Sequence, residues 1–129
     1  MNTELEQELF NTYPNLFKYH HEQNNDKLNP PVSHEIQCED GWFDIINSAC
    51  ELISNENVNV HFTQIKEKFG GLRIYHDGLK GDTEDVYKVI GIIDFAKEIS
   101  YNTCEICGNK GELIQTGWLR VRCEKCKEN

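Results

Sequence analysis

The sequence of 129 residues lacks any apolar run that approaches the roughly 18 residues of a membrane-spanning helix. Its longest apolar stretch, residues 89–93, is only long enough for the buried side of an ordinary helix. The N-terminus, Met-Asn-Thr-Glu-Leu-Glu, is acidic and has no resemblance to a secretory signal peptide. We therefore expect a cytoplasmic protein with no membrane partner, in a compartment where cysteines stay reduced.

Basic side chains are scarce, because 13 lysines and arginines stand against 22 aspartates and glutamates, for a formal net charge of −9. Tight binding to nucleic acid rests on neutralising phosphates, so this charge argues against it. The acidity is uneven: residues 1–40 carry eight acidic and two basic side chains, whereas residues 104–129 carry four acidic and five basic ones. The front of the chain is therefore the acidic part.

The chain contains neither an internal repeat nor a low-complexity segment, and its length fits one domain with a sizeable core. Residues 3–10 predict a short helix with Thr3 as its N-cap and Glu6 completing a capping box. The other predicted elements are a polar loop over 22–41, helices over 42–54 and 83–100, and two strands within 58–76 that meet at Gly70-Gly71.

Four of the six cysteines form two C-x2-C pairs with 15 residues between them. The pairs are Cys104 with Cys107 and Cys123 with Cys126. Two thiolates in such a pair reach one metal from a tight turn, and two pairs at this spacing suit one tetrahedral structural zinc ion, Zn2+. The residues between the pairs predict two strands that turn at Gly117, so residues 104–129 predict a zinc ribbon.

Other readings of these cysteines are weaker. A redox C-x-x-C motif needs no second pair, and four thiolates leave a zinc ion no open position for catalysis. A zinc deaminase needs H-x-E and P-C-x-x-C, but Thr103 and Arg122 occupy the proline positions. The remaining cysteines, Cys38 and Cys50, are interpreted as ordinary buried thiols. No histidine shows metal spacing, although His20-His21-Glu22 and His76-Asp77 could supply an acid–base group.

Taken together, these elements predict an α+β fold in which helices pack on a small antiparallel sheet and a zinc ribbon closes the C-terminus. Its parts are an acidic N-terminal helix and loop (1–37), an α-β-β-α core (38–103) and the ribbon (104–129), in one compact unit. Trp42 and Trp118 are expected to pack in the core or against the ribbon.

The predicted hairpin carries the second signal. If Gly70-Gly71 is a two-residue turn, Lys68 pairs with Arg73 and Lys66 pairs with Tyr75. Alternation then places one cationic, aromatic set on a single face: Lys66, Lys68, Arg73 and Tyr75. The apolar face would hold Ile65, Phe69, Leu72 and Ile74, with Glu67 as the misfit among them.

Like charges opposite one another weaken a hairpin unless an acidic partner or an anionic ligand relieves them. The face formed by Lys66, Lys68, Arg73 and Tyr75 is therefore a candidate site for a phosphate-bearing ligand or a protein carboxylate. A solvated outer face, neutralised by the protein's own acidic residues, is the alternative.

Several short motifs resemble those of a loosely defined group of small, mostly uncharacterised phage and bacterial proteins. These motifs are Glu39-Asp40-Gly41-Trp42-Phe43, a K-x-K-F-G-x-L-R segment from Lys66 with Ile74 interposed before Tyr75, a helix ending near Ser100, C-E-x-C-G from Cys104 to Gly108, and Gly117-Trp118. The resemblance covers about residues 38–126. In that group the last ligand is often another metal-binding residue, whereas here it is Cys126.

The resemblance brings no established activity but implies a phage-type accessory protein, which would act in the host cytoplasm, and small acidic proteins of that kind often block host defences. We therefore predict a non-catalytic binding protein that captures an anionic nucleotide-type ligand or a host defence protein. Two alternatives stay open: a protein inhibitor that acts through the acidic residues 1–40, and a small nucleotide-directed hydrolase or nuclease. A homo-oligomer is compatible with either.

Overall fold

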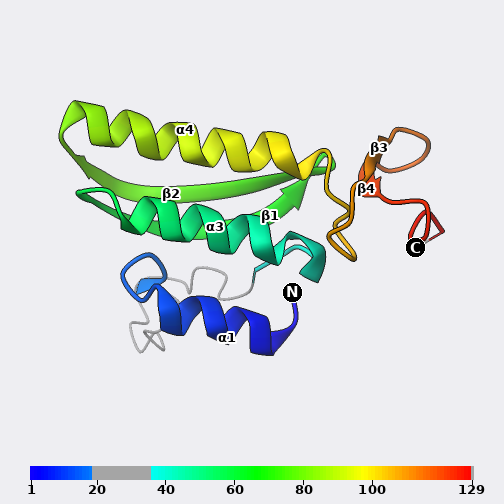
Figure 1. Cartoon of the computed structure of the whole chain (residues 1–129), viewed down its shortest axis with the longest axis horizontal. Coiled ribbons are helices and arrows are strands. Elements are labelled where there is room, and N and C mark those ends of the chain that lie inside the picture. The colour runs from blue at the N-terminus through cyan, green and yellow to red at the C-terminus, as the bar shows by residue number, and fades with distance from the viewer. Residues whose placement is uncertain (19–35, 129) are drawn as a thin grey trace, which may run out of the picture.

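The computed structural model describes residues 1–18 and 36–128. Its elements follow the chain as α1 (Thr3–Thr12), η1 (Asp40–Trp42), α3 (Phe43–Ser54), β1 (Val58–Lys68), β2 (Gly71–Gly81), α4 (Thr83–Ser100), β3 (Glu112–Ile114) and β4 (Arg120–Arg122). Figure 1 shows α1, α3 and α4 as three roughly parallel rods, with the β1–β2 hairpin along α3 and α4 and the β3–β4 segment at one end. The predicted α+β architecture is confirmed. No helix among the described residues has the length and apolarity needed to cross a membrane.

The first helix begins one residue earlier than its predicted cap implies. Asn2 is the N-cap, and its side chain accepts a hydrogen bond from the backbone N–H two residues on, at 2.7 Å. Thr3 is already helical, so the prediction of Thr3 as N-cap is wrong. Phe10 of this helix contacts Phe17, whose ring packs edge-on against Phe62 of β1 at a centroid distance of 5.4 Å. Aromatic contacts thus attach α1 to the hairpin.

The main core lies where α3 and α4 meet the hairpin. The predicted helix over 42–54 is realised as η1 followed by α3, and the predicted helix over 83–100 is α4. Most apolar side chains at helical spacing face inward from both helices, as the pattern predicts. The most deeply buried of them are Trp42, Ile46, Ala49, Cys50, Ile53, Val89 and Ala96. Leu52 and Ile90 share that spacing but are 51% and 40% exposed, so the prediction is wrong for these two.

The hairpin turn is one residue earlier than predicted. Its two turn residues are Phe69 and Gly70, with φ of 54° and 85°, and Lys68 pairs with Gly71. Both φ values are positive, as in the type I′ turns whose twist matches that of paired strands. The predicted pairing of Lys68 with Arg73 is therefore wrong, and Lys66 pairs with Arg73 instead.

The earlier turn changes which residues pair across the hairpin, but it does not change the face of the sheet on which each residue lies. Each pairing moves by two residues, and because side chains alternate with a period of two, every strand residue keeps its predicted side of the sheet. Phe69 is the exception, because it lies in the turn and is 66% exposed instead of packing on the apolar face. Glu67, the misfit of the predicted apolar face, accepts a hydrogen bond from the Gly70 backbone N–H at 2.9 Å and so caps the turn.

The second strand is longer than predicted and runs to Gly81, so it includes His76-Asp77. A register shift between Phe62 and Gln64 accommodates one extra residue in β1. The shift keeps both Phe62 and Ile65 buried, although they are three positions apart and strict alternation would place them on opposite faces. Gln37 adds a short parallel bridge along the free edge of β1.

Candidate functional site

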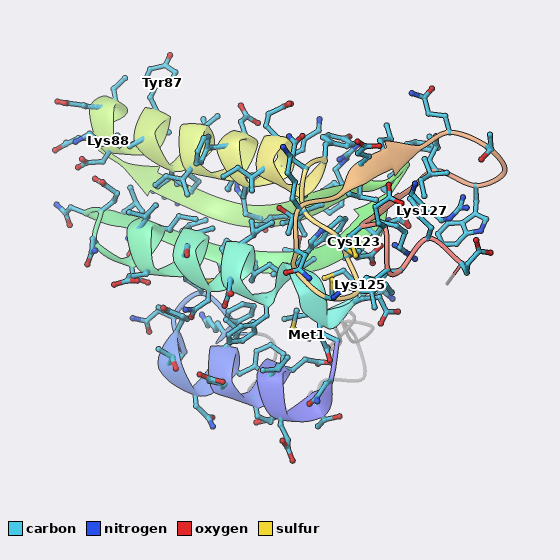
Figure 2. All side chains as sticks on the ribbon, turned by 45° about the vertical axis from the view of Figure 1, so that its right-hand side comes forward. Met1, Tyr87, Lys88, Cys123, Lys125 and Lys127 are labelled. Carbon is cyan, nitrogen blue, oxygen red and sulfur yellow. The ribbon has the colours of Figure 1, made fainter. Side chains whose placement is uncertain are left out.

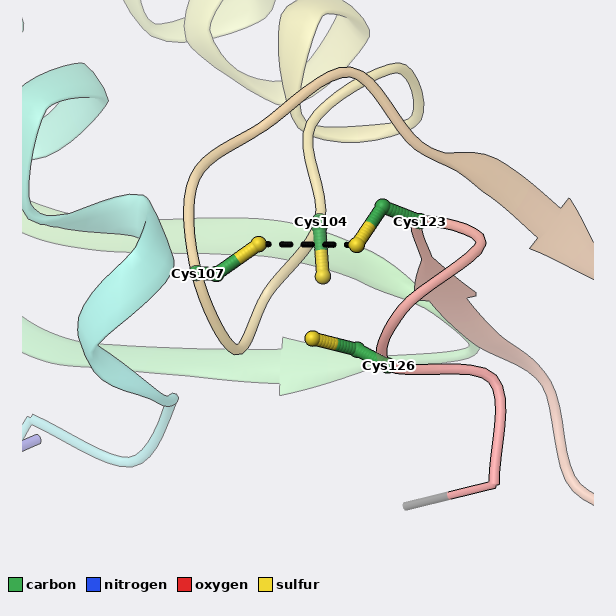
Figure 3. Close-up of side chains that lie close together, drawn as sticks. All are labelled: Cys104, Cys107, Cys123 and Cys126. Carbon is green, nitrogen blue, oxygen red and sulfur yellow. Dashed lines mark hydrogen bonds between the residues drawn. The ribbon is translucent and has the colours of Figure 1, made fainter.

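Four cysteine side chains converge in the C-terminal segment that we call the cysteine ribbon, residues 103–128. Figure 3 shows Cys104 and Cys107 on the loop that follows α4, facing Cys123 and Cys126 on the loop that follows β4. Their four sulfur atoms all lie within 4.8 Å of one another, and the Sγ atoms of Cys107 and Cys123 are 3.5 Å apart. Four sulfurs at 2.3 Å from a tetrahedral ion lie about 3.8 Å apart, so this arrangement fits one metal ion.

The electrostatics of the cluster favour metal binding. Burial alone would raise the pKa of Cys104, but hydrogen bonds from the backbone of Cys107, Cys123 and Ile106 lower this pKa to about 7. In contrast, hydrogen bonding with Cys123 raises the pKa of Cys126. The first thiolate therefore forms near neutral pH, and a bound cation would replace the protons that the other sulfurs still share.

The first cysteine turn is fastened to the start of α3. The Gly41 backbone N–H donates to the Glu105 carbonyl oxygen at 2.8 Å, and the Trp42 indole N–H donates to the Thr103 carbonyl oxygen at 2.9 Å. A Cβ on Gly41 would overlap the Cys104 carbonyl oxygen, which explains why glycine stands there. The acidic-Gly-Trp and C-E-x-C-G motifs are thus two halves of one contact.

A buried ion pair completes this contact. The Arg122 guanidinium lies 3.5 Å from the Glu105 carboxylate, and both side chains are almost fully covered. The other Glu105 oxygen accepts a hydrogen bond from the Glu39 backbone N–H at 3.1 Å. Burial raises the pKa of Glu105, although the Glu39 hydrogen bond and the charge of Arg122 act in the opposite direction. The ion pair therefore fixes the position of the first cysteine turn relative to Glu39, although moving its two charges out of water costs free energy.

The hairpin turn lies against the same ribbon. A Cβ on Gly70 would come within 2.6 Å of the Leu113 side chain in β3, and one on Gly71 would come within 2.5 Å of the Tyr101 ring. The first glycine of the pair thus serves both the turn and the contact with the ribbon, and the second makes room for Tyr101. The ribbon, the hairpin turn and the start of α3 consequently form one end of the molecule.

The four residues of the predicted cationic set belong to the outer face of the hairpin, and we call them the cationic face: Lys66, Lys68, Arg73 and Tyr75. Lys66 lies opposite Arg73, and its ammonium is 5.6 Å from the centre of the Tyr75 ring. Arg73 donates to the Tyr101 hydroxyl at 3.3 Å. Three positive charges and two tyrosines are therefore neighbours on this side.

The cationic face has no acidic neighbour at ion-pair distance within residues 1–18 and 36–128. The ion pairs found there are His61–Asp77, Lys88–Glu84, Arg122–Glu105 and Lys127–Glu124. None of them includes Lys66, Lys68 or Arg73. In a protein of net charge −9, the described part of the chain thus supplies no carboxylate to neutralise these three cations.

Within residues 1–18 and 36–128, the remaining candidates lie apart: two buried thiols and one histidine–aspartate pair. Cys38 and Cys50 are buried in the core, where burial raises the pKa of both thiols, that of Cys38 to about 12, so both are poor nucleophiles. Asp77 lies 3.9 Å from His61 of β1. The predicted acid–base candidate His20-His21-Glu22 lies outside the described residues.

Two aromatic residues are largely exposed: Trp118, which contacts the ribbon as expected, and Phe69, which was predicted on the apolar face. Trp118 is 57% exposed, and the guanidinium carbons of Arg120 and Arg122 lie 4.8 and 5.2 Å from its ring centre. Phe69 is exposed in the hairpin turn with Lys68 5.6 Å from its ring centre. The positive φ of Phe69, rare for a bulky residue, could not be read from the sequence because the neighbouring Gly-Gly pair suggests a turn one residue later.

Comparison of the chain with protein-family models, with curated proteins and with solved structures found no match.

Proposed function

We propose that the cysteine ribbon holds a structural zinc ion and that the cationic face binds an anionic, nucleotide-type ligand without catalysis. Cys104, Cys107, Cys123 and Cys126 would all be ligands. An all-sulfur tetrahedral set is typical of zinc, and it leaves no coordination position for substrate. The ion would stabilise the ribbon that supports the hairpin turn.

One observation carries the binding proposal: Lys66, Lys68 and Arg73 lie together without an acidic neighbour among the described residues. Ammonium and guanidinium groups bind phosphate oxygens with charge-assisted hydrogen bonds. Tyr75, 39% exposed beside Lys66, offers a ring on which a base can stack. A ligand with both a phosphate and an aromatic base fits this combination better than a simple anion does.

The direct test is a thermal-shift assay of the zinc-loaded protein with a panel of mono-, di- and cyclic nucleotides, and with inorganic phosphate as the control ligand. We expect a nucleotide to raise the melting temperature and Lys66→Ala/Arg73→Ala to abolish that rise. Lys80→Ala/Lys88→Ala is the matched control, because it removes two positive charges from other parts of the surface. Equal shifts in the two double variants would contradict the assignment.

The second candidate for the cationic face is an acidic surface on a partner protein, since carboxylates and phosphates bind the same donors. We infer that this partner is a host defence protein if the chain has the accessory role that the resemblance to phage proteins implies. The same double variants test this candidate in a pull-down with a named defence protein. Binding that survives Lys66→Ala/Arg73→Ala would rule out the face as its site.

A further inference from the structure

An apolar groove lies between α3 and α4, and its lining includes no residue of the cationic face or of the cysteine ribbon. Ile45 and Leu52 line it from α3, and Ile92, Phe95 and Ile99 line it from α4. Its volume is about 250 Å³. The two helices run side by side (Figure 1). None of these residues contributes to the proposed nucleotide site.

Two apolar side chains of the groove are open to water, and its isoleucines are half-buried. Phe95 is 64% exposed and Leu52 is 51% exposed, although both belong to helices that bury their other apolar faces. Burial of apolar surface stabilises a protein by about 25 cal/mol per square ångström, and surface left in water lacks this stabilisation. Clustered apolar side chains of this kind, bordered by polar residues, mark interaction surfaces in soluble proteins.

Acidic residues border the groove. Asp44 lines it directly, and Glu51 and Glu98 lie one helical turn after the lining residues Ser48 and Phe95. All three are exposed, and α3 contains no basic residue. On α4, Lys88 lies 3.9 Å from its own Glu84, and Lys97, the other basic residue of this helix, does not line the groove. The border of the groove is therefore negative.

The spacing of the apolar residues matches that of a helix. Ile45 and Leu52, and likewise Ile92 and Ile99, are seven residues apart, which is about 10.5 Å along an α-helix. A guest helix presents apolar side chains at i, i+3 or i+4, and i+7 over the same length, which is how amphipathic helices bind grooves. Two copies of this protein would bring negative borders together, so charge disfavours self-association through the groove.

From this apolar floor, its spacing and its acidic border, we propose that the α3–α4 groove binds an amphipathic α-helix of a partner protein, with apolar residues on one face and lysine or arginine on either side. The attraction between the acidic border of the groove and the basic residues of the partner helix would orient that helix. Burial of Phe95 and Leu52 would supply most of the affinity.

The test uses two labelled synthetic peptides of about 18 residues, or five helical turns. Both carry leucines at i, i+3, i+4 and i+7, and one has lysine and arginine where the other has glutamate. We expect fluorescence polarisation to show binding of the basic peptide to the zinc-loaded full chain and no binding of the acidic peptide. Raising the salt concentration should weaken the complex.

Variants of the groove residues test whether the basic peptide binds in the groove. Leu52→Ala/Phe95→Ala should weaken binding of the basic peptide by about tenfold or more, and Asp44→Asn/Glu98→Gln by several-fold. Tyr87→Ala is the matched control: this side chain is 68% exposed, points away from the body of the protein (Figure 2) and does not line the groove. Its binding should equal that of the wild type.

Four outcomes would overturn the proposal. The basic peptide could bind the Leu52→Ala/Phe95→Ala variant as tightly as the wild type, which would indicate unspecific attraction to an acidic protein. The acidic peptide could bind equally well, or the basic peptide could fail to bind. Finally, light scattering could show a wild-type dimer that Leu52→Ala/Phe95→Ala converts to a monomer, which would make a second copy the occupant.

Discussion

Replacing Gly41 by alanine tests whether the ribbon is held to the core by the close approach of two backbones. The new Cβ would overlap the Cys104 carbonyl oxygen and lie 2.5 Å from that of Glu105, whereas ordinary van der Waals contact begins at 3.4 Å. Both atoms belong to the backbone of the first cysteine turn and cannot rotate away. Since the φ angle of Gly41 is not in the positive region, the perturbation is steric and not conformational.

The size of the effect follows from the movement required. The cysteine turn must retreat by about 0.9 Å, which lengthens the hydrogen bond from Gly41 to Glu105 from 2.8 Å to about 3.7 Å, beyond hydrogen-bond range. The bond from the Trp42 indole to Thr103 weakens with it. Overpacking costs about 1–3 kcal/mol and each hydrogen bond about 0.5–1.5 kcal/mol, so we expect a loss of about 2–5 kcal/mol.

Urea unfolding of the zinc-loaded protein, followed by tryptophan fluorescence, measures this loss, because the Trp42 indole is fully buried. Gly91→Ala is the matched control, since a Cβ there has open space in the middle of α4 and should stabilise the helix by about 0.5–1 kcal/mol. If Gly41→Ala lowers the free energy of unfolding by less than about 1 kcal/mol, the close approach of the two backbones does not hold the ribbon to the core.

Four further outcomes are expected. Phe69→Asn should raise the free energy of unfolding, measured in urea, by about 0.5–1 kcal/mol, because Asn-Gly suits a type I′ turn better than a phenylalanine with φ of 54°. A loss of stability would contradict the inference that the backbone of Phe69 is strained. Arg122→Ala should cost about 3 kcal/mol because it leaves Glu105 buried without its partner, whereas Lys127→Ala, at an exposed ion pair, should cost under about 1 kcal/mol; similar losses would show that burial is irrelevant. Chelation of zinc should speed amide hydrogen exchange first in the cysteine ribbon, and uniform protection before and after chelation would argue against a structural ion. The raised pKa of the Cys38 thiol means that the folded state retains its proton above the pKa of the unfolded thiol, so stability should fall as pH rises from about 8.5 towards 12. Cys38→Ala should reduce this slope in urea titrations at increasing pH, and the buried Cys50 thiol should maintain the rest of it. A slope that Cys38→Ala leaves unchanged would exclude the Cys38 thiol as a cause.

The helices and the cysteine ligands were predictable because their signals are local. Helical spacing of apolar residues identifies the buried faces of α3 and α4, and the two C-x2-C pairs identify four sulfurs that reach one point. The face on which Lys66 and Arg73 lie was also predictable, since strand alternation survives a pairing shift of two residues.

The turn and the roles of the glycines were not predictable in the same way. Gly70-Gly71 suggests a turn, but Gly71 makes room for Tyr101, which is thirty residues away in the sequence. The turn itself falls on Phe69 and Gly70. Gly41 likewise looks like a helix-start residue, and only its closeness to Cys104 explains why it has no side chain.

The sequence by itself determined the α+β class, the four converging cysteines and the grouping of cations on one strand face, because helix period, strand period and short ligand spacing act over a few residues. Only the tertiary structure decided where the ribbon docks, which charges have partners and that α3 and α4 leave an apolar groove between them. Those features depend on contacts between segments tens of residues apart, such as Glu105 with Glu39 and Leu52 beside Phe95. A sequence pattern specifies which face a residue occupies, whereas packing specifies what that face meets.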